Sequence, residues 1–197
     1  MKRGLLFVVL AAIVLLVPVA VVISAPQAAW VKYPGNPVFQ PGTDVVSWDN
    51  RNVYAAKVLY VGNGYLMWYS GNGETSVNPR IGYAWSQDGV NWTRHPDPVL
   101  LPGATGWDAR GVSAPSVLYK DGLWHMWYAG KDLLHYSIGY ATSTDKIAWT
   151  KYEHNPVLTA GGENDADNVD VVSPHVLFKD GLFHMWYAGR GETNQIF

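Results

Sequence analysis

Hydrophobic residues dominate the start of the chain and then alternate with polar residues in short stretches. Lys2 and Arg3 precede residues 5–23, a run that contains no charged side chain. A basic start followed by an apolar run is typical of an export signal, and this run is also close to the ~20 residues that span a bilayer. We therefore expect residues 1–29 to be a cleaved signal peptide or a retained signal anchor.

Beyond this leader, the pattern of apolar and polar positions repeats. The triplet Met-Trp-Tyr recurs every 59 residues, at 67–69, 126–128 and 185–187. The match around the triplets extends without a gap over residues 53–71, 112–130 and 171–189. A fixed period of this length is typical of solenoids and propellers.

Each repeat predicts four short strands, most clearly in the second copy. Two apolar stretches, 113–119 and 123–128, flank Asp121-Gly122, a pair that favours a tight hairpin. Asn63-Gly64 and Asp180-Gly181 hold the corresponding place in the other copies. A third strand is expected at 138–141, and Trp149 marks a fourth ahead of a proline turn.

Four short antiparallel strands per repeat are the pattern of a propeller blade. Residues 30–39 resemble a fourth strand with its proline turn, but no first three strands precede them. The prediction is an all-β propeller domain over residues 30–197, made of an initial outer strand and about two and a half blades. Because a closed ring needs at least four blades, we expect this domain to be incomplete.

Composition narrows the partners. The chain has no cysteine, so an exported domain must be held together by burial alone. Without Lys2 and Arg3 the formal charge changes from 14 − 16 = −2 to 12 − 16 = −4. A net negative charge argues against nucleic acid or anionic lipid as the main partner, because both favour basic surfaces.

The ten tryptophans suggest either sugar stacking or packing. Most of them recur at the same place in successive repeats, which favours packing between blades. Trp85 breaks the pattern, because Thr142 stands at its place in the next repeat. Trp85 is therefore the better candidate for substrate binding at the surface.

Three aspartates occupy one register ahead of the first strand: Asp49, Asp108 and Asp167. Carboxylates that converge on a funnel can act as general acid and base, with Arg51 and Arg110 beside them as clamps for an anionic group. The alternative is that the repeated aspartate stabilises a turn in every blade, since scaffolding needs like residues and catalysis needs unlike ones.

The third repeat differs from the others in two ways. Asp165, Asp167 and Asp170 lie in an acidic stretch that could supply oxygen ligands to a Ca²⁺ ion, with a solvated loop as the alternative. His175 replaces the Lys57 and Ser116 of the other repeats and is a candidate for substrate binding.

Three segments carry a resemblance to a known superfamily: residues 113–130, 138–143 and 149–158. They resemble the five-bladed propeller glycoside hydrolases, which include arabinanases, β-xylosidases, invertases, levansucrases and mannoside phosphorylases. The resemblance covers residues 30–197. Its motifs are strand and turn motifs, so they are specific for the fold and weakly specific for the chemistry.

The resemblance also implies where acids should stand. Many of these hydrolases carry an Asp in blade one, an Asp in blade three and a Glu in blade four, and in several families the first Asp directly precedes a Pro. Here that place holds Ala55, Ala114 and Ser173. Catalysis would then require Asp49 as the blade-one acid and Asp167 or Asp170 as the blade-three acid, with the proton donor beyond residue 197.

The sequence thus predicts an exported carbohydrate-active propeller, in the cell envelope or outside the cell, that hydrolyses or transfers a sugar at a carboxylate-lined central funnel. The alternative is a non-catalytic propeller that binds glycans or envelope partners on the same face. The expected partner is a carbohydrate, with membrane attachment through residues 5–23 if the leader is retained. No cofactor is expected besides Ca²⁺.

Overall fold

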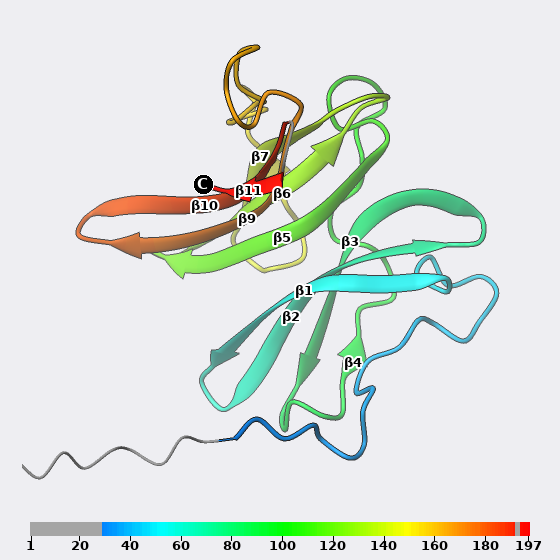
Figure 1. Cartoon of the computed structure of the whole chain (residues 1–197). Helices are drawn as coiled ribbons and strands as arrows, with labels where there is room; N and C mark the ends of the chain where they lie inside the picture. Colours follow the sequence, from blue (N-terminus) through cyan, green and yellow to red (C-terminus); the bar gives the residue numbers. More distant parts are fainter. Residues whose placement is uncertain (1–28, 192–193) are drawn as a thin grey trace, which may run out of the picture. The chain divides into compact units, whose positions relative to one another are not determined.

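The structure is a computed structural model and describes residues 29–191 and 194–197 (Figure 1). Contacts divide the chain into Met1–Pro34 and Gly35–Phe197, and every described strand belongs to the second unit. The apolar run at 5–23 lies outside the described residues. Among the residues that are described, no helix is long and apolar enough to cross a membrane.

The first sheet has four antiparallel strands in the order of the sequence. Its members are β1 (Asn52–Val61), β2 (Gly64–Gly73), β3 (Ser76–Ser86) and β4 (Thr93–Arg94). The second sheet repeats this order with β5 (Gly111–Lys120), β6 (Leu123–Lys131), β7 (Tyr136–Ser143) and β8 (Thr150–Lys151). The prediction of four-stranded antiparallel blades is confirmed.

The third sheet contains three described strands: β9 (Asp170–Lys179), β10 (Leu182–Arg190) and β11 (Asn194–Ile196). Strand β10 pairs with both neighbours. The described chain therefore contains two four-stranded blades and part of a third, as the repeat predicted.

The hairpins form where the turn residues predicted them, with one correction. Asp121 and Gly122 adopt φ values of 52° and 81° between β5 and β6, which is the left-handed pair of a tight hairpin turn. In the first repeat, the turn residues between β1 and β2 are Gly62 and Asn63. The prediction of Asn63-Gly64 was wrong by one residue, because Gly62 supplies the positive φ, at 66°.

Consecutive sheets pack face to face through aromatic and aliphatic side chains. Trp68 and Tyr83 of the first sheet form one buried cluster with Val117, Trp124 and Met126 of the second. A further cluster joins Trp127 and Ile138 of the second sheet to Val171 and Val176 of the third. Burial of these side chains is the main force that holds the sheets together in a chain without disulfides.

The packing role predicted for the repeated tryptophans is confirmed where two sheets meet. Trp48, Trp68, Trp124 and Trp127 are all buried. Trp186 occupies the same register as Trp68 and Trp127 but is half exposed. The difference arises because, among the described residues, no fourth sheet covers the outer face of β10.

The initial outer strand predicted at the start of the domain was wrong. Residues 29–51 contain no strand. A fourth strand needs a third strand to pair with, and no described sheet pairs with these residues. Asn36-Pro37 nevertheless shares a cis peptide bond with its repeat equivalent Asn155-Pro156, so the proline turn is retained.

Candidate functional site

A cavity of about 610 Å³ opens where the first strands of the three sheets meet. Figure 1 shows β5 and β9 running side by side, and β1 also contacts β5. Tyr54 and Ala55 of β1, Ala114 of β5, and Asp170 and Ser173 of β9 line the cavity. The sheets therefore bring residues from three repeats to one place.

Each first strand carries a bulge at the cavity. The register of β1 shifts between Tyr54 and Lys57, and that of β5 shifts between Ser113 and Ser116. Ala55, Ala114 and Ser173 adopt φ values of 47°, 49° and 53°. A left-handed conformation costs a residue with a Cβ about 1–2 kcal/mol, and such strain is concentrated at functional sites.

Hydrogen bonds between sheets hold the bulged strands in place. The backbone N–H of Ala114 donates to Oγ of Ser70, 2.8 Å away in the first sheet. One repeat later, the N–H of Val176 donates over 2.9 Å to Oγ of Ser116. Both serines are buried, so each bond fixes the position of a first strand relative to the preceding sheet.

The cavity contains one carboxylate and two cations. Asp170 forms an ion pair with Arg190, its partner across β9 and β10, and Oδ1 of Asp170 accepts a 2.7 Å hydrogen bond from the N–H of Tyr136. Lys131 also lines the cavity, and its ammonium lies 5.1 Å from the centre of the Tyr136 ring. The charged groups thus gather on one side, around Tyr136.

Tyr54 and Tyr136 provide the aromatic part of the wall. Burial raises the pKa of the Tyr54 hydroxyl, and the charge that Tyr136 would carry raises it further. The Tyr54 phenol therefore stays protonated across the physiological range and can donate a hydrogen bond to a ligand oxygen. Its ring can also pack against the apolar face of a sugar.

The three aspartates predicted to converge lie instead within their own blades. Each carboxylate accepts a hydrogen bond from a tyrosine twenty residues later: Asp49 from Tyr69 at 2.9 Å, Asp108 from Tyr128 at 3.5 Å, and Asp167 from Tyr187 at 2.8 Å. All three aspartates are buried, and none lines the 610 Å³ cavity.

A cation of the fourth strand completes two of these arrangements. Nε of Arg94 lies 3.0 Å from Oδ2 of Asp49, and Lys151 pairs with Asp108. Burial raises the pKa of the Tyr69 and Tyr128 hydroxyls well above 10.0, and the neighbouring aspartate charge adds to the effect. A repeated contact between loop, second strand and fourth strand favours the scaffolding alternative for Asp49, Asp108 and Asp167.

The other residues that the sequence singled out are dispersed. Arg51 is exposed, and Arg110 lines a separate cavity of about 520 Å³ beside Asp132 and Leu134. His175 is exposed on β9 opposite Trp186, and Trp85 stacks on Tyr83 at 6.1 Å. Of the predicted site residues, Asp170 is the one that lines the 610 Å³ cavity.

The acidic stretch of the third repeat does not form a joint ligand set. Oδ2 of Asp165 accepts a 2.7 Å hydrogen bond from Gly162, Asp167 is bound by Tyr187, and Asp170 by Arg190. In the described part of the chain, no three acidic, histidine or cysteine side chains are grouped as metal ligands would be. Ca²⁺ binding by Asp165, Asp167 and Asp170 stays a prediction without a site in this structure.

Sequence reasoning missed Tyr54, Lys131, Tyr136 and Arg190. A usable signal was present for two of them. Lys131 and Arg190 are one repeat apart, at the place that holds Asn72 in the first copy. A cation that recurs at the end of a second strand, where the first copy has an amide, indicates a charged site shared by the second and third repeats.

Comparisons with known proteins agree on a carbohydrate-active family. The sequence profile of glycoside hydrolase family 130, described as β-1,4-mannooligosaccharide phosphorylase, matches residues 31–161. An uncharacterized protein of Mycobacterium tuberculosis is 27% identical over 177 residues, which cover 83% of this chain and 56% of that protein. A β-1,2-mannobiose phosphorylase of Thermoanaerobacter is 29% identical over 157 residues, covering 72% of this chain and 51% of that enzyme.

Solved structures show the same fold. A structure from the family 130 mannoside phosphorylases, from a study of members that hydrolyse β-1,2-mannosidic linkages in Candida mannan, aligns with a TM-score of 0.64 at 20% identity. The alignment covers 83% of this chain and 55% of that one. The chain thus spans about half the length of the relatives it matches.

Proposed function

Because the chain belongs to glycoside hydrolase family 130, we propose that its 610 Å³ cavity binds a mannoside and supports transfer of the mannosyl group to inorganic phosphate. The observation that carries this proposal is the composition of the cavity wall, which has one carboxylate, Asp170, beside two cations, Lys131 and Arg190. Phosphorolysis needs this balance of charges more than hydrolysis does.

Hydrolysis of a glycoside ordinarily uses two carboxylates, about 5–9.5 Å apart, one of which activates water or attacks the sugar. Phosphate needs no such activation, because it is already an anion. It needs cations that hold it against the sugar carbon, and Arg and Lys are the side chains that bind phosphate best. A wall with a single carboxylate and two cations therefore favours phosphate as the nucleophile.

The proposed step is balanced as follows. A phosphate oxygen forms a bond to the anomeric carbon of the mannosyl unit while the glycosidic C–O bond breaks. The leaving sugar oxygen takes a proton, for which we assign an acid outside the described lining, since Asp170 is bound by Arg190. The products are mannose 1-phosphate and a shortened sugar.

The described residues then have distinct roles. Lys131 and Arg190 hold phosphate, and Asp170 acts as a positioning residue that orients the Arg190 guanidinium. That guanidinium has five N–H donors, so it can bind Asp170 and still bind phosphate. Tyr54 and Tyr136 contact the sugar through their rings and hydroxyls.

A second function is favoured by one specific observation. The three bulges place Ala55, Ala114 and Ser173 at the cavity, and none of these side chains can ionise. A cavity that lacks acids at its most strained positions suits glycan binding without catalysis. The same residues would then bind the sugar, and the cations would bind an acidic substituent.

We also propose that this site functions outside the cytoplasm, on the basis of Lys2, Arg3 and the apolar run at 5–23. Expression in a bacterial host followed by fractionation and N-terminal mass analysis tests this. A mature protein that starts near Trp30, or an intact protein in the membrane fraction, supports export. An intact protein in the soluble cytoplasmic fraction contradicts it.

The test of the main proposal is incubation of the chain with β-1,2- and β-1,4-linked mannobiose, with and without phosphate. We expect mannose 1-phosphate by ³¹P NMR only when phosphate is present. Free mannose at a rate independent of phosphate would instead identify a hydrolase. Saturable binding of mannobiose without any product would establish the non-catalytic alternative.

Variants then test the assigned residues. Lys131→Gln and Arg190→Gln should each raise the KM for phosphate by at least about 10-fold, because each removes a charge that binds the anion. Asp170→Asn should raise the same KM more than it lowers kcat, as expected of a positioning residue. Lys179→Gln is the matched control, since Lys179 is exposed on β9 and absent from the cavity wall.

A further inference from the structure

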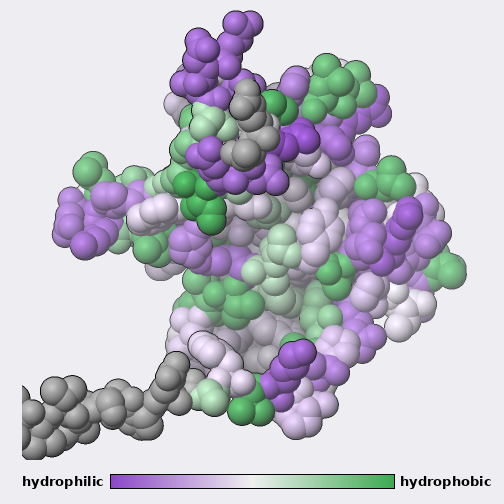
Figure 2. All heavy atoms as spheres, in the orientation of Figure 1, coloured by the Kyte–Doolittle hydropathy of each residue, from purple (hydrophilic) through white to green (hydrophobic). Residues whose placement is uncertain are grey.

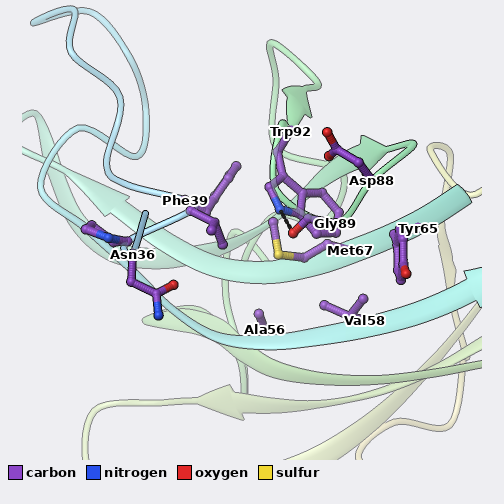
Figure 3. A pocket seen from close by; sticks show the side chains of 11 residues that line it. Asn36, Phe39, Ala56, Val58, Tyr65, Met67, Asp88, Gly89 and Trp92 are labelled. Atoms are coloured by element: carbon purple, nitrogen blue, oxygen red, sulfur yellow. Dashed lines mark hydrogen bonds between the residues drawn. The ribbon is translucent and has the colours of Figure 1, made fainter. Parts of the chain in front are cut away.

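The first sheet has an apolar face with a large cavity of about 910 Å³ (Figure 3). Val58 of β1, Tyr65 and Met67 of β2, and Trp92 line it together with Phe39. The one charged residue of the wall, Asp88, accepts hydrogen bonds from the N–H groups of Val90 and Asn91 in its own turn. The cavity therefore offers an apolar surface without a charge free to bind a polar ligand.

The repeat shows what such a face accommodates. Val117 and Val176, the equivalents of Val58, are 1% and 2% exposed because a preceding sheet covers them, whereas Val58 is 44% exposed. In the second sheet the covering group is Trp68, whose ring lies 5.4 Å from that of Trp124 and 6.3 Å from that of Trp149. Each covered face thus receives a tryptophan from the sheet before it.

The third sheet repeats this arrangement. Trp127 of the second sheet packs against Phe183 with ring centres 5.1 Å apart. Trp124, Phe183 and Tyr65 occupy the same register in the three repeats. Tyr65 is therefore the residue of the first sheet that an incoming tryptophan ring would meet.

A hydrogen bond adds direction to this packing. The carbonyl of Lys146 accepts the indole N–H of Trp149 at 2.9 Å and that of Trp68 at 3.4 Å. Its equivalent in the first sheet is the carbonyl of Gly89, which lines the cavity and accepts the indole N–H of Trp92 at 3.1 Å (Figure 3). A carbonyl oxygen has two lone pairs, so Gly89 can accept a second indole N–H.

The matching group is exposed at the other end of the described chain. Trp186 has the register of Trp68 and Trp127, yet it is 46% exposed while they are 0% and 7% exposed. Leu177 beside it is also exposed. Figure 2 shows hydrophobic side chains on the projecting β9–β10 hairpin.

We propose that the first sheet of one copy binds the outer face of β9 and β10 of a second copy, with Trp186 in the 910 Å³ cavity and its indole N–H bonded to the Gly89 carbonyl. The interface continues the packing that already joins the first sheet to the second and the second to the third. It is heterologous, since the two copies contribute different surfaces, and it leads to head-to-tail association. The proposal is independent of the proposed mannoside chemistry.

Sedimentation velocity of the chain from about 1 to about 100 μM tests the proposal, because this range detects micromolar association. We expect association that increases with concentration. Val58→Asp blocks one surface and Trp186→Asp blocks the other, and each should weaken association by at least about tenfold, as buried interface anchors do. Leu133→Asp is the control, since Leu133 is equally apolar and exposed but lies on neither surface.

Mixing the two blocked variants separates loss of the interface from loss of the fold. Each variant retains one intact surface, so the mixture should form a 1:1 dimer that goes no further. This dimer would show that both variants are folded and that the surfaces differ. A monomer at every concentration, or association that neither aspartate weakens, would overturn the proposal.

Discussion

The hydroxyl of Tyr69 donates a 2.9 Å hydrogen bond to Oδ2 of Asp49, and the same pair recurs in each repeat. The bond links the loop that enters a blade to the second strand of that blade. It recurs as Tyr128 with Asp108 and as Tyr187 with Asp167. A contact present in all three blades stabilises the scaffold, and it explains why these aspartates repeat.

Replacement of Tyr69 by Phe should lower the free energy of unfolding by about 1–3 kcal/mol, because Asp49 is fully buried and loses one of its partners. Urea unfolding followed by tryptophan fluorescence measures this. Tyr119→Phe is the control, since Tyr119 is 57% exposed. Equal stability of Tyr69→Phe and Tyr119→Phe would show that the Asp49 bond contributes nothing.

The same tyrosines should make the fold sensitive to alkali. Burial and the adjacent carboxylates raise the pKa of Tyr69 and Tyr128 in the folded state above 10.0. The unfolded chain then loses these protons first, so their contribution is complete below pH 10 and decreases as the pH rises above it.

Each tyrosine should contribute up to about 1.4 kcal/mol per pH unit to this decline. Urea unfolding at a series of pH values from neutral to strongly alkaline measures it. The decline should be shallower in Tyr69→Phe and in Tyr128→Phe, and unchanged in Tyr119→Phe. A variant that declines as steeply as the wild type would contradict the assignment.

Gly139 allows a close approach between Trp107 and the second sheet. A Cβ at this position would lie 2.4 Å from Cη2 of Trp107 and 2.8 Å from the Tyr128 ring. Gly139→Ala should therefore lower the free energy of unfolding by about 1–3 kcal/mol through overpacking. In Gly162→Ala, the matched control, the nearest atom would be at an ordinary 3.6 Å, and thermal unfolding should show a decrease only in Gly139→Ala.

The left-handed conformation of Ala114 predicts opposite effects for two substitutions. Ala114→Gly removes the steric cost of φ at 49° and should keep the stability or raise it by up to about 1 kcal/mol. Ala114→Val places a β-branched side chain in this conformation and should lower stability by at least about 1 kcal/mol. Chemical denaturation of both variants checks this, and a stable Ala114→Val protein would contradict the strained bulge.

The fold could be predicted from the sequence because the repeat shows its period directly. The Met-Trp-Tyr triplets, the Asp121-Gly122 turn and the tryptophan register were enough to define blades and to assign Trp68 and Trp127 to packing. The single-residue error at Gly62 arose because both Gly62 and Gly64 flank Asn63, so composition alone did not distinguish the two turns.

The candidate site was harder to predict, because it depends on geometry that the sequence does not show. Acidic residues drew attention to Asp49 and Asp167, but both side chains turn into their own blades. Tyr54 reaches the cavity because a bulge follows it, and Lys131 and Arg190 reach it from the ends of second strands. A single sequence does not locate a bulge, so neither side-chain direction was available.

The bulges at Ala55, Ala114 and Ser173 divide each first strand into two independent parts. The part before the bulge supplies the cavity wall, and the part after it supplies Val58, Val117 and Val176 to the packing faces. Changes at Tyr54, Ser113 or Val172 can therefore alter ligand preference with little effect on the faces where sheets meet. Such a division of labour along one strand allows a repeated scaffold to acquire new substrates while its stability is preserved.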